Sequence, residues 1–272
     1  MIAVKKVSPY YNSNPKVKKF IKEGRGQGVG TDYIPWVKTH EFSSIGRATR
    51  TMGVKTPRIF HMQSDNQYRA FLSFEYSSMI LDIRESFPLL DVMEVIDYKE
   101  DLRFDKFVDK ETREPFVITT SFLLSVKEPG GGEKYVARTV KSTSELNRKI
   151  TWENLEIQRR YWQSMGVQWQ IITDKQLPRQ QAKNIEWVRE TLLEGSEGEL
   201  NKEALSLSLL QYLLENEVQP LKEVLRAFDK REGLEKGAGL FLFRYLVAKK
   251  EILLDMNKVI DFSFPVQNIL LI

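Results

Sequence analysis

The sequence predicts an α/β domain followed by a helical, winged-helix-like domain. The first observation is a pair of strand candidates rich in β-branched residues, 115–126 and 134–141, on either side of a glycine turn. The second is a polar, glycine-bearing stretch at 193–199, after which apolar residues recur at helical spacing. We therefore expect two domains, residues 1–195 and residues 196–272, which suits a chain of 272 residues.

Helices and strands are expected to alternate in the N-terminal domain. Ser64 or Asp65 is a candidate cap for the first helix, and Gly166 a candidate end for the second. A helix between two strands indicates a βαβ-like crossover. Residues 1–20 are expected to start without regular structure. The expected elements are a helix at 64–79, strands at 79–84, 115–126 and 134–141, a helix at 144–164, a strand at 168–173 and a helix at 179–193.

The C-terminal domain is expected to contain three helices, 200–216, 220–230 and 234–250. Pro220 stands at a favourable first-turn position of the second helix. Residues 251–264 alternate apolar and polar side chains, as a small hairpin would. Three helices and a hairpin are typical of a winged-helix module, although the apolar third helix favours packing over base reading.

Charge is unevenly distributed along the chain. The net charge is +4, yet residues 1–60 contain 12 Lys and Arg and only 3 acids, so the remainder is net acidic. This asymmetry favours contact between the N-terminal arm and a polyanion such as DNA. The alternative is a solvated, weakly ordered leader.

The glycine-rich stretch 22–30 alternates glycine with other residues, which predicts a loop. Its backbone amides are suited to phosphate contact, but a plain flexible loop explains it equally well. It matches neither the phosphate-binding loop of nucleotide hydrolases nor the dinucleotide-binding fingerprint.

Several classes of site and location are excluded or disfavoured by composition. The chain has no cysteine and two histidines, His40 and His61, which excludes disulfides and thiolate metal sites and leaves little room for histidine chemistry. No apolar run reaches 18 residues, so no transmembrane helix is expected. The N-terminus lacks a signal peptide pattern, and a cytosolic location fits.

The hairpin at 115–141 carries the candidate chemistry. Nucleases of the PD-(D/E)xK class place an acid on one strand, and an acid or amide two residues before a lysine on the next. The acids hold Mg²⁺, which generates the attacking hydroxide, and the lysine positions water or offsets phosphate charge. Thr139-Val140-Lys141 fits the lysine half, whereas Ser121 stands where the acid belongs. On its own this motif is weakly diagnostic, because hairpins ending in lysine are common.

Four stretches, in order, resemble the TnsA family, the endonuclease subunit of heteromeric transposases. They lie within residues 21–36, 71–90, 159–163 and 171–187. The runs Lys-Glu-Gly-Arg-Gly-Gln-Gly and Asp-Tyr-Ile-Pro-Trp are the most specific. Beyond residue 195 the resemblance rests mainly on architecture, since the family also ends in a helical, winged-helix-like domain.

The resemblance implies a restriction-endonuclease-like (PD-(D/E)xK) fold and a Mg²⁺-dependent site. The family's catalytic positions fall at Gln67, Ser121, Thr139 and Lys141, and only Lys141 retains the family residue. Metal ligands would be Gln67, Ser121 and the carbonyl of Val140, a poor set because Mg²⁺ prefers carboxylates. We therefore expect a degraded site with doubtful Mg²⁺ binding. Restoring Glu, Asp and Gln at 67, 121 and 139 is expected to restore nicking.

The resemblance also implies partners: transposon-end DNA, the DDE transposase TnsB and the AAA+ ATPase TnsC, in the bacterial cytoplasm and at the nucleoid during transposition. We expect mainly a structural subunit of the transposase that binds DNA and partners. One alternative is an active endonuclease cleaving the 5′ ends of the transposon, with Glu156 as a replacement ligand. Another is a DNA-binding adaptor on a recycled nuclease fold. The DNA-binding candidates are Lys22, Arg25, Gly26, Gln27, Arg47 and Arg50.

Overall fold

The computed structural model describes residues 7–41, 47–193, 195 and 201–271. The chain divides into two compact units, Met1–Leu177 and Pro178–Ile272, earlier than the expected boundary at 195. The division falls there because α5 (Arg179–Arg189) packs against α8 (Ala238–Lys249) of the second unit. Most of the linker expected at 193–199 lies outside the described residues. No helix in the described ranges has the length and apolarity needed to cross a bilayer.

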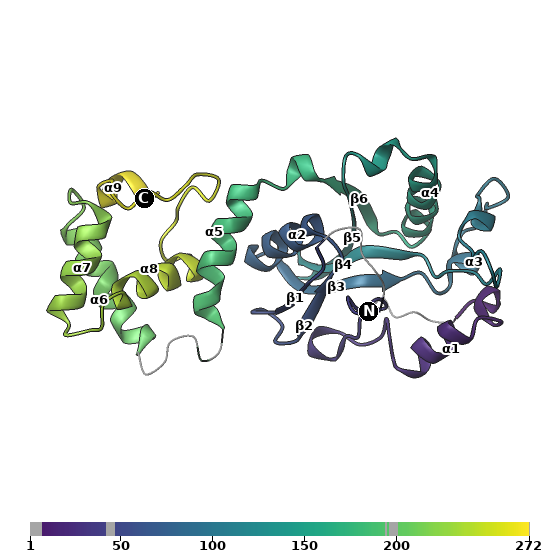
Figure 1. The fold of residues 1–272 in the computed structure, drawn as a ribbon, viewed down its shortest axis with the longest axis horizontal. Helices are drawn as coiled ribbons and strands as arrows, with labels where there is room; N and C mark the ends of the chain where they lie inside the picture. Colours follow the sequence, from purple (N-terminus) through teal and green to yellow (C-terminus); the bar gives the residue numbers. More distant parts are fainter. Residues whose placement is uncertain (1–6, 42–46, 194, 196–200, 272) are drawn as a thin grey trace. The chain divides into compact units, whose positions relative to one another are not determined.

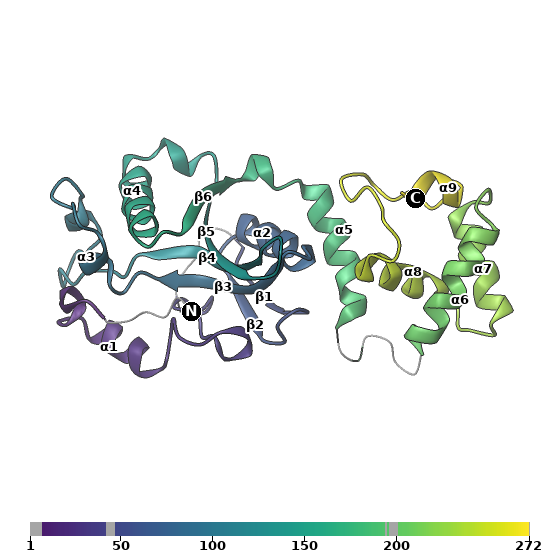
Figure 2. The same cartoon turned by 180° about the vertical axis from the view of Figure 1, so that it is seen from behind.

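A four-stranded mixed sheet in the order β3-β4-β5-β6 organises the first unit (Figure 1). The first three strands are antiparallel neighbours, and β5 pairs with β6 in parallel. The helix α4 connects β5 to β6 and packs beside β6, which confirms the expected crossover (Figures 1 and 2). The strands are β3 (Ile80–Pro88), β4 (Thr119–Lys127), β5 (Glu133–Lys141) and β6 (Gln168–Thr173), and the helix is α4 (Lys149–Ser164).

The helix expected at 64–79 is also present, as α2 (Asp65–Tyr76), and Ser64 caps it by accepting a hydrogen bond from the backbone N–H of Gln67. The sequence did not predict the small hairpin of β1 (Thr49–Met52) and β2 (Ile59–Met62), or the one-turn helix α3 (Val92–Val95). Such short elements contain too few residues for a hydrophobic period to be recognised.

The stretch 1–20 was expected to start without regular structure, and its described part contains a helix. Residues Pro15–Lys22 form the helix α1, because Asn14 accepts hydrogen bonds from two backbone N–H groups and Pro15 stands at the first helical position. Val17 and Phe20 are buried, while the lysines of this helix are exposed. Residues 1–6 lie outside the described residues.

One core fills the space between the sheet, α4 and the N-terminal segment. It combines aliphatic side chains with several large aromatic ones, each of which stabilises the fold by about 1.5–3 kcal/mol when buried. Trp162 and Tyr161 of α4 stack edge to face, and Trp162 meets Phe87 of β3. This packing fixes α4, and therefore its polar side chains, against β4 and β5.

The second unit is helical, as expected. Its three predicted helices appear as α6 (Lys202–Glu215), α7 (Leu221–Arg231) and α8, and a short α9 (Val266–Ile269) follows. The hairpin expected at 251–264 is absent. Asp255 and Asp261 instead accept hydrogen bonds from backbone N–H groups two residues ahead, which turns the chain twice. Only isolated bridges form around this segment, so it contains no wing.

Candidate functional site

The candidate site begins where β4 and β5 separate. The backbone pairing of the two strands ends at Phe122 and Arg138. The next two residues, Ser121 and Thr139, therefore do not pair with each other. The backbone N–H of Val140 donates instead to the hydroxyl oxygen of Ser121, at 3.0 Å. The Ser121 side chain thus replaces a ladder hydrogen bond at the point where the strands diverge.

A cavity of about 280 Å³ lies in this region of the first unit. All five positions that the sequence associated with catalysis or metal binding line it: Gln67, Ser121, Thr139, Val140 and Lys141. It is also lined by five polar residues that sequence reasoning missed: Gln63, Ser86, Thr119, Asn154 and Gln158. In the sequence these residues differ from others only in being polar residues next to apolar ones, and this pattern is too common to identify a site.

A buried hydrogen-bond network occupies one wall of this cavity. The Gln158 side-chain oxygen accepts from the hydroxyls of Thr120 (3.0 Å) and Thr139 (2.6 Å). The indole N–H groups of Trp162 and Trp169 donate to the same two threonines, at 2.8 and 2.9 Å. The threonine hydroxyls, the indole N–H groups and the Gln158 oxygen of this network therefore all have hydrogen-bond partners. Thr139 acts as a structural link between β5, α4 and β6.

Gln67 lines the cavity from the first turn of α2. Its side-chain oxygen accepts from the backbone N–H of Gln63 at 2.8 Å, while its own N–H donates to Ser64. This reciprocal arrangement resembles a capping box, so the amide already has a structural task. Ser86, across the cavity, has a positive φ of 49°, which is strained for a non-glycine residue and often accompanies functional sites.

Lys141 is the cation of the site. Its ammonium nitrogen lies 3.2 Å from Glu145, a partner that the sequence did not single out. Burial raises the pKa of Glu145, but hydrogen bonds from Ser142 and the charge of Lys141 outweigh burial, so the net pKa is lowered. Glu145 therefore stays ionised and holds the lysine at the cavity edge.

The donor set does not fit Mg²⁺. Among the described residues, those lining the cavity contribute amides, hydroxyls and one ammonium, but no carboxylate. In the same part of the chain, no group of three His, Cys, Asp or Glu side chains is placed to hold a metal. Hard divalent cations need carboxylate oxygens to offset the loss of their hydration shell. A protonated lysine beside neutral ligands would repel the ion further.

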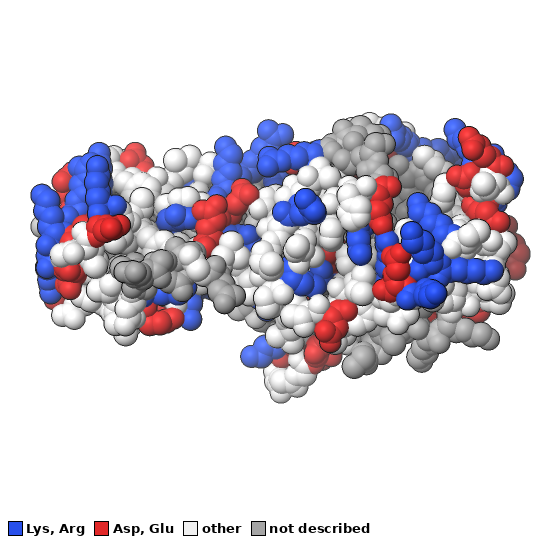
Figure 3. Space-filling view, turned by 60° about the horizontal axis from the view of Figure 1, so that its bottom comes forward, with Lys and Arg blue, Asp and Glu red and all other residues white. Residues whose placement is uncertain are grey.

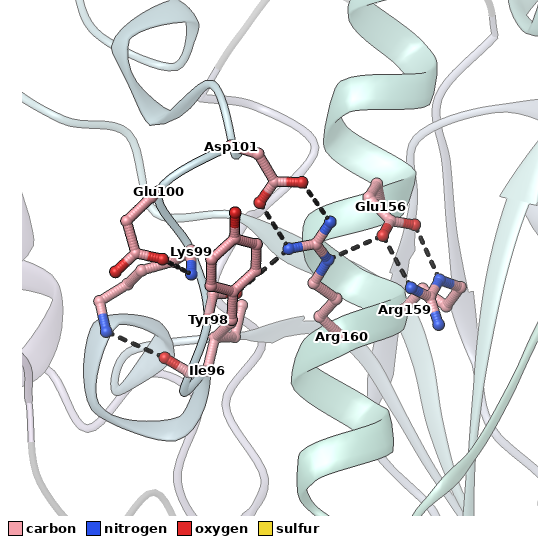
Figure 4. Close-up of polar contacts among 8 residues, drawn as sticks. All are labelled: Ile96, Tyr98, Lys99, Glu100, Asp101, Glu156, Arg159 and Arg160. Atoms are coloured by element: carbon pink, nitrogen blue, oxygen red, sulfur yellow. Dashed lines mark hydrogen bonds and ion pairs between the residues drawn. The ribbon is translucent and has the colours of Figure 1, made fainter.

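Glu156, the expected replacement acid, does not face the cavity. Asn154 and Gln158 line the cavity from α4, and Glu156, two residues from each, points to the other side of the helix. Figure 4 shows its carboxylate between Arg159 and Arg160, with N–O distances of 2.7 and 2.8 Å. The hydrogen bond from Arg159 lowers the pKa of Glu156 to about 2. The interpretation of Glu156 as a replacement ligand is therefore wrong.

Arg160 continues the network of Figure 4 to the preceding loop. It pairs with Asp101 at 2.7 Å and donates to the Tyr98 carbonyl. Its guanidinium also lies 5.8 Å from the centre of the Tyr98 ring. These contacts tie the loop at 96–101 to α4. Arg159 and Arg160 therefore have structural partners within the protein, and their positions need no bound ligand to explain them.

The candidate DNA-binding residues divide by exposure. Lys22, Gln27, Arg47 and Arg50 are exposed. Arg25 is 3% exposed; its guanidinium donates to Glu41 at 2.6 Å, contacts Glu23 and lies over the Phe20 ring. The hydrogen bond from Arg25 lowers the pKa of Glu41 to about 2. The geometry gives Arg25 a structural role in this conformation.

The glycine-rich loop is explained by close packing. Gly26 has a φ of 75°, and a Cβ there would lie 2.3 Å from Pro88. At Gly28, with a φ of 84°, a Cβ would lie 2.4 Å from the carbonyl oxygen of Asp32. The N–H of Gly26 donates to Ile34, so it is already used within the protein. Glycine is required here by the fold itself.

Comparison with known proteins adds to this geometry. Residues 77–174 match a family model described as the TnsA-like endonuclease N terminal, and residues 176–256 match the TnsA endonuclease C terminal. The chain is also 37% identical over 259 residues to the Transposon Tn7 transposition protein TnsA of Escherichia coli, which covers 90% of this chain and 88% of that protein. The chain belongs to the TnsA family.

Membership of the TnsA endonuclease family confirms the resemblance inferred from the sequence. It also confirms a mixed α/β domain of the TnsA endonuclease type followed by a helical TnsA domain. The two matched regions meet within a few residues of the division between the two compact units.

Proposed function

We propose that this chain is the TnsA-type subunit of a Tn7-like transposase and acts at transposon-end DNA with TnsB-like and TnsC-like partners. Its nuclease site is degraded, and its main contribution is to bind DNA and partners. The proposal of a degraded site rests on the cavity at positions 67, 121, 139 and 141. Among the described residues, those that line this cavity contribute a lysine and neutral groups but no carboxylate.

The lack of carboxylates in the cavity lining supports a degraded site over an active one. An active site would need at least one acid close enough to hold Mg²⁺, and two acids that follow Lys141 on the adjoining helical segments are paired with basic side chains. Glu145 pairs with Lys141, and Glu156 pairs with Arg159 and Arg160. Mn²⁺ or Mg²⁺ bound by amides and hydroxyls alone would be held too weakly for catalysis at millimolar concentration.

The test is to restore the acids. Gln67→Glu with Ser121→Asp should confer Mg²⁺ binding and Mg²⁺-dependent nicking of transposon-end DNA. A carboxylate at 67 also suits the first turn of α2, because anions are favoured at helix N-termini. Thr139 must be kept, since glutamine is larger and Thr139 is 2% exposed within the Gln158 network.

The matched control is the same double variant with Lys141→Ala, which should bind Mg²⁺ but nick poorly. Calorimetry with Mg²⁺ and a nicking assay on supercoiled end-containing DNA measure the two effects separately. A folded double variant that neither binds Mg²⁺ nor nicks would show that this cavity is not the former nuclease site.

A further inference from the structure

A second cavity, of about 270 Å³, lies beside the first in the N-terminal unit. Its walls include three aromatic rings, Phe20, Trp36 and Phe116, and the side chain of Lys16. Val37, Phe116 and Val117 line both cavities, so the two adjoin. We call the second cavity, with its three aromatic rings, the aromatic cavity, and the first cavity, at the candidate site, the polar cavity.

Specific contacts build the aromatic cavity. The Asn14 side chain donates to the Pro115 carbonyl at 3.0 Å, and Ser13 donates to Glu114 at 2.7 Å. These bonds tie the start of α1 to the segment that leads into Phe116. The N–H of Phe116 donates to the Phe107 carbonyl at 2.8 Å, so its backbone is fixed. Its ring is nonetheless 53% exposed, on the wall between the two cavities.

The charges around these cavities favour an anionic occupant. Basic side chains gather on the surface around α1 (Figure 3). The acid in the aromatic cavity, Glu41, is neutralised by Arg25. Lys141 stands at the edge of the polar cavity, paired with Glu145, and the described residues that line this cavity bring no negative charge of their own. The exposed lysines of α1 are Lys16, Lys18, Lys19 and Lys22.

We propose that the adjoining cavities bind an unpaired nucleotide of a DNA strand, with its base against Phe116 in the aromatic cavity and a neighbouring phosphate near Lys16 or Lys141. This inference rests on the proposed DNA-binding function. Base stacking on aromatic rings combined with lysine–phosphate contact is the general chemistry of single-strand recognition. A base within a duplex cannot bind in this way, because its neighbours cover both of its faces.

The dimensions agree with this occupant. A cavity of about 270 Å³ lies at the small end of known ligand pockets and suits one base rather than a base pair. The amides and hydroxyls of the polar cavity, among them Gln63 and Asn154, can hydrogen-bond to sugar or base edges. The loss of the carboxylates removes the repulsion that a phosphate would meet there without a metal.

The experiment compares two DNA probes with the full-length protein by fluorescence anisotropy. One is a blunt 20-base-pair duplex, and the other carries three unpaired thymidines at one end. The wild-type protein should bind the second probe about tenfold more tightly, the value expected from stacking one base. Phe116→Ala should abolish this preference and leave blunt-duplex affinity unchanged. Phe264→Ala, which removes an equally exposed ring (53%) from the second unit, should preserve it.

Permanganate oxidation gives a second readout, because it attacks only unstacked thymines. One unpaired thymine should be protected by the wild type and by Phe264→Ala, but not by Phe116→Ala. Equal affinity of the wild type for both probes, or a preference that survives Phe116→Ala, would overturn the inference and leave the DNA-binding function intact. No binding to either probe would overturn both.

Discussion

Two neighbouring cations at the start of the chain show how the environment of a residue decides its role. Sequence reasoning grouped Lys22 and Arg25 as candidates for DNA contact, because both lie in a basic arm. The structure separates them, since the Lys22 side chain is exposed while Arg25 is buried against Glu41 and Phe20. Burial of a side chain in a loop depends on packing far along the chain, which local composition does not encode.

Replacing each of the two with alanine tests this division. Arg25→Ala should lower the free energy of unfolding by about 2–4 kcal/mol, because it leaves Glu41 without its partner. Lys22→Ala should change stability by less than about 0.5 kcal/mol but reduce the salt slope of DNA binding by about 1. Urea unfolding and salt titrations of affinity measure the two effects, and a reversed pattern would return Arg25 to the DNA interface.

His61 gives stability a pH dependence. Burial and the nearby cations Lys38, His40 and Arg50 lower its pKa to about 4, so protonation is easier in the unfolded chain, where the pKa is about 6.5. The stabilisation from neutral His61 is therefore complete above pH 6.5 and is lost as pH falls toward 4.

Between pH 7.5 and 5.0 the loss should be about 1 kcal/mol, allowing for the partial exposure of the ring. His61→Gln should remove this part of the fall, since a glutamine oxygen can still accept from Thr39 as the ring nitrogen does. Unfolding by urea at the two pH values checks this prediction. An equal fall in both proteins would assign the pH dependence to other groups.

At the scale of elements, the periodicity of apolar residues predicted the larger helices and strands, including the β5–α4–β6 crossover. It did not predict the short and turn-rich segments. α1 has only two buried apolar residues, so its cap is a stronger signal than its hydrophobic pattern. The prediction of a hairpin at 251–264 is wrong because the turns formed by Asp255 and Asp261 override the alternation of apolar and polar residues.

The candidate site divides in the same way. The resemblance singled out the residues on β4, β5 and α2 that surround one cavity, although their chemical roles stay predictions. It did not indicate Gln158 or Asn154, because the value of a buried polar side chain depends on the hydroxyls and indoles packed around it.

The Gln158 network should contribute strongly to the stability of the sheet. Gln158→Leu keeps a similar volume but leaves the hydroxyls of Thr120 and Thr139 without their acceptor, at a cost of about 2–4 kcal/mol. Gln163→Leu makes the same change at an exposed position of α4 and should cost less than about 0.5 kcal/mol. Thermal unfolding of the two variants compares them directly, and equal stabilities would show that the network adds nothing.

For the whole molecule, family membership and site chemistry lead to different expectations. The chain belongs to an endonuclease family, and its two regions match that family in order. The cavity at Gln67, Ser121, Thr139 and Lys141, which the resemblance associates with catalysis, nevertheless lacks carboxylates among the residues described. We propose that this protein keeps the surfaces needed for assembly and has lost the step that requires a metal, because binding surfaces do not depend on the acids of the site.

The most direct test is 5′-strand cleavage of transposon-end DNA by the wild-type protein together with its TnsB-like and TnsC-like partners, in Mg²⁺ and in Mn²⁺. We predict normal assembly on the DNA and no 5′-strand cleavage with either metal. Cleavage by the wild type that disappears in Lys141→Ala would contradict it and establish an active nuclease with an unusual metal shell.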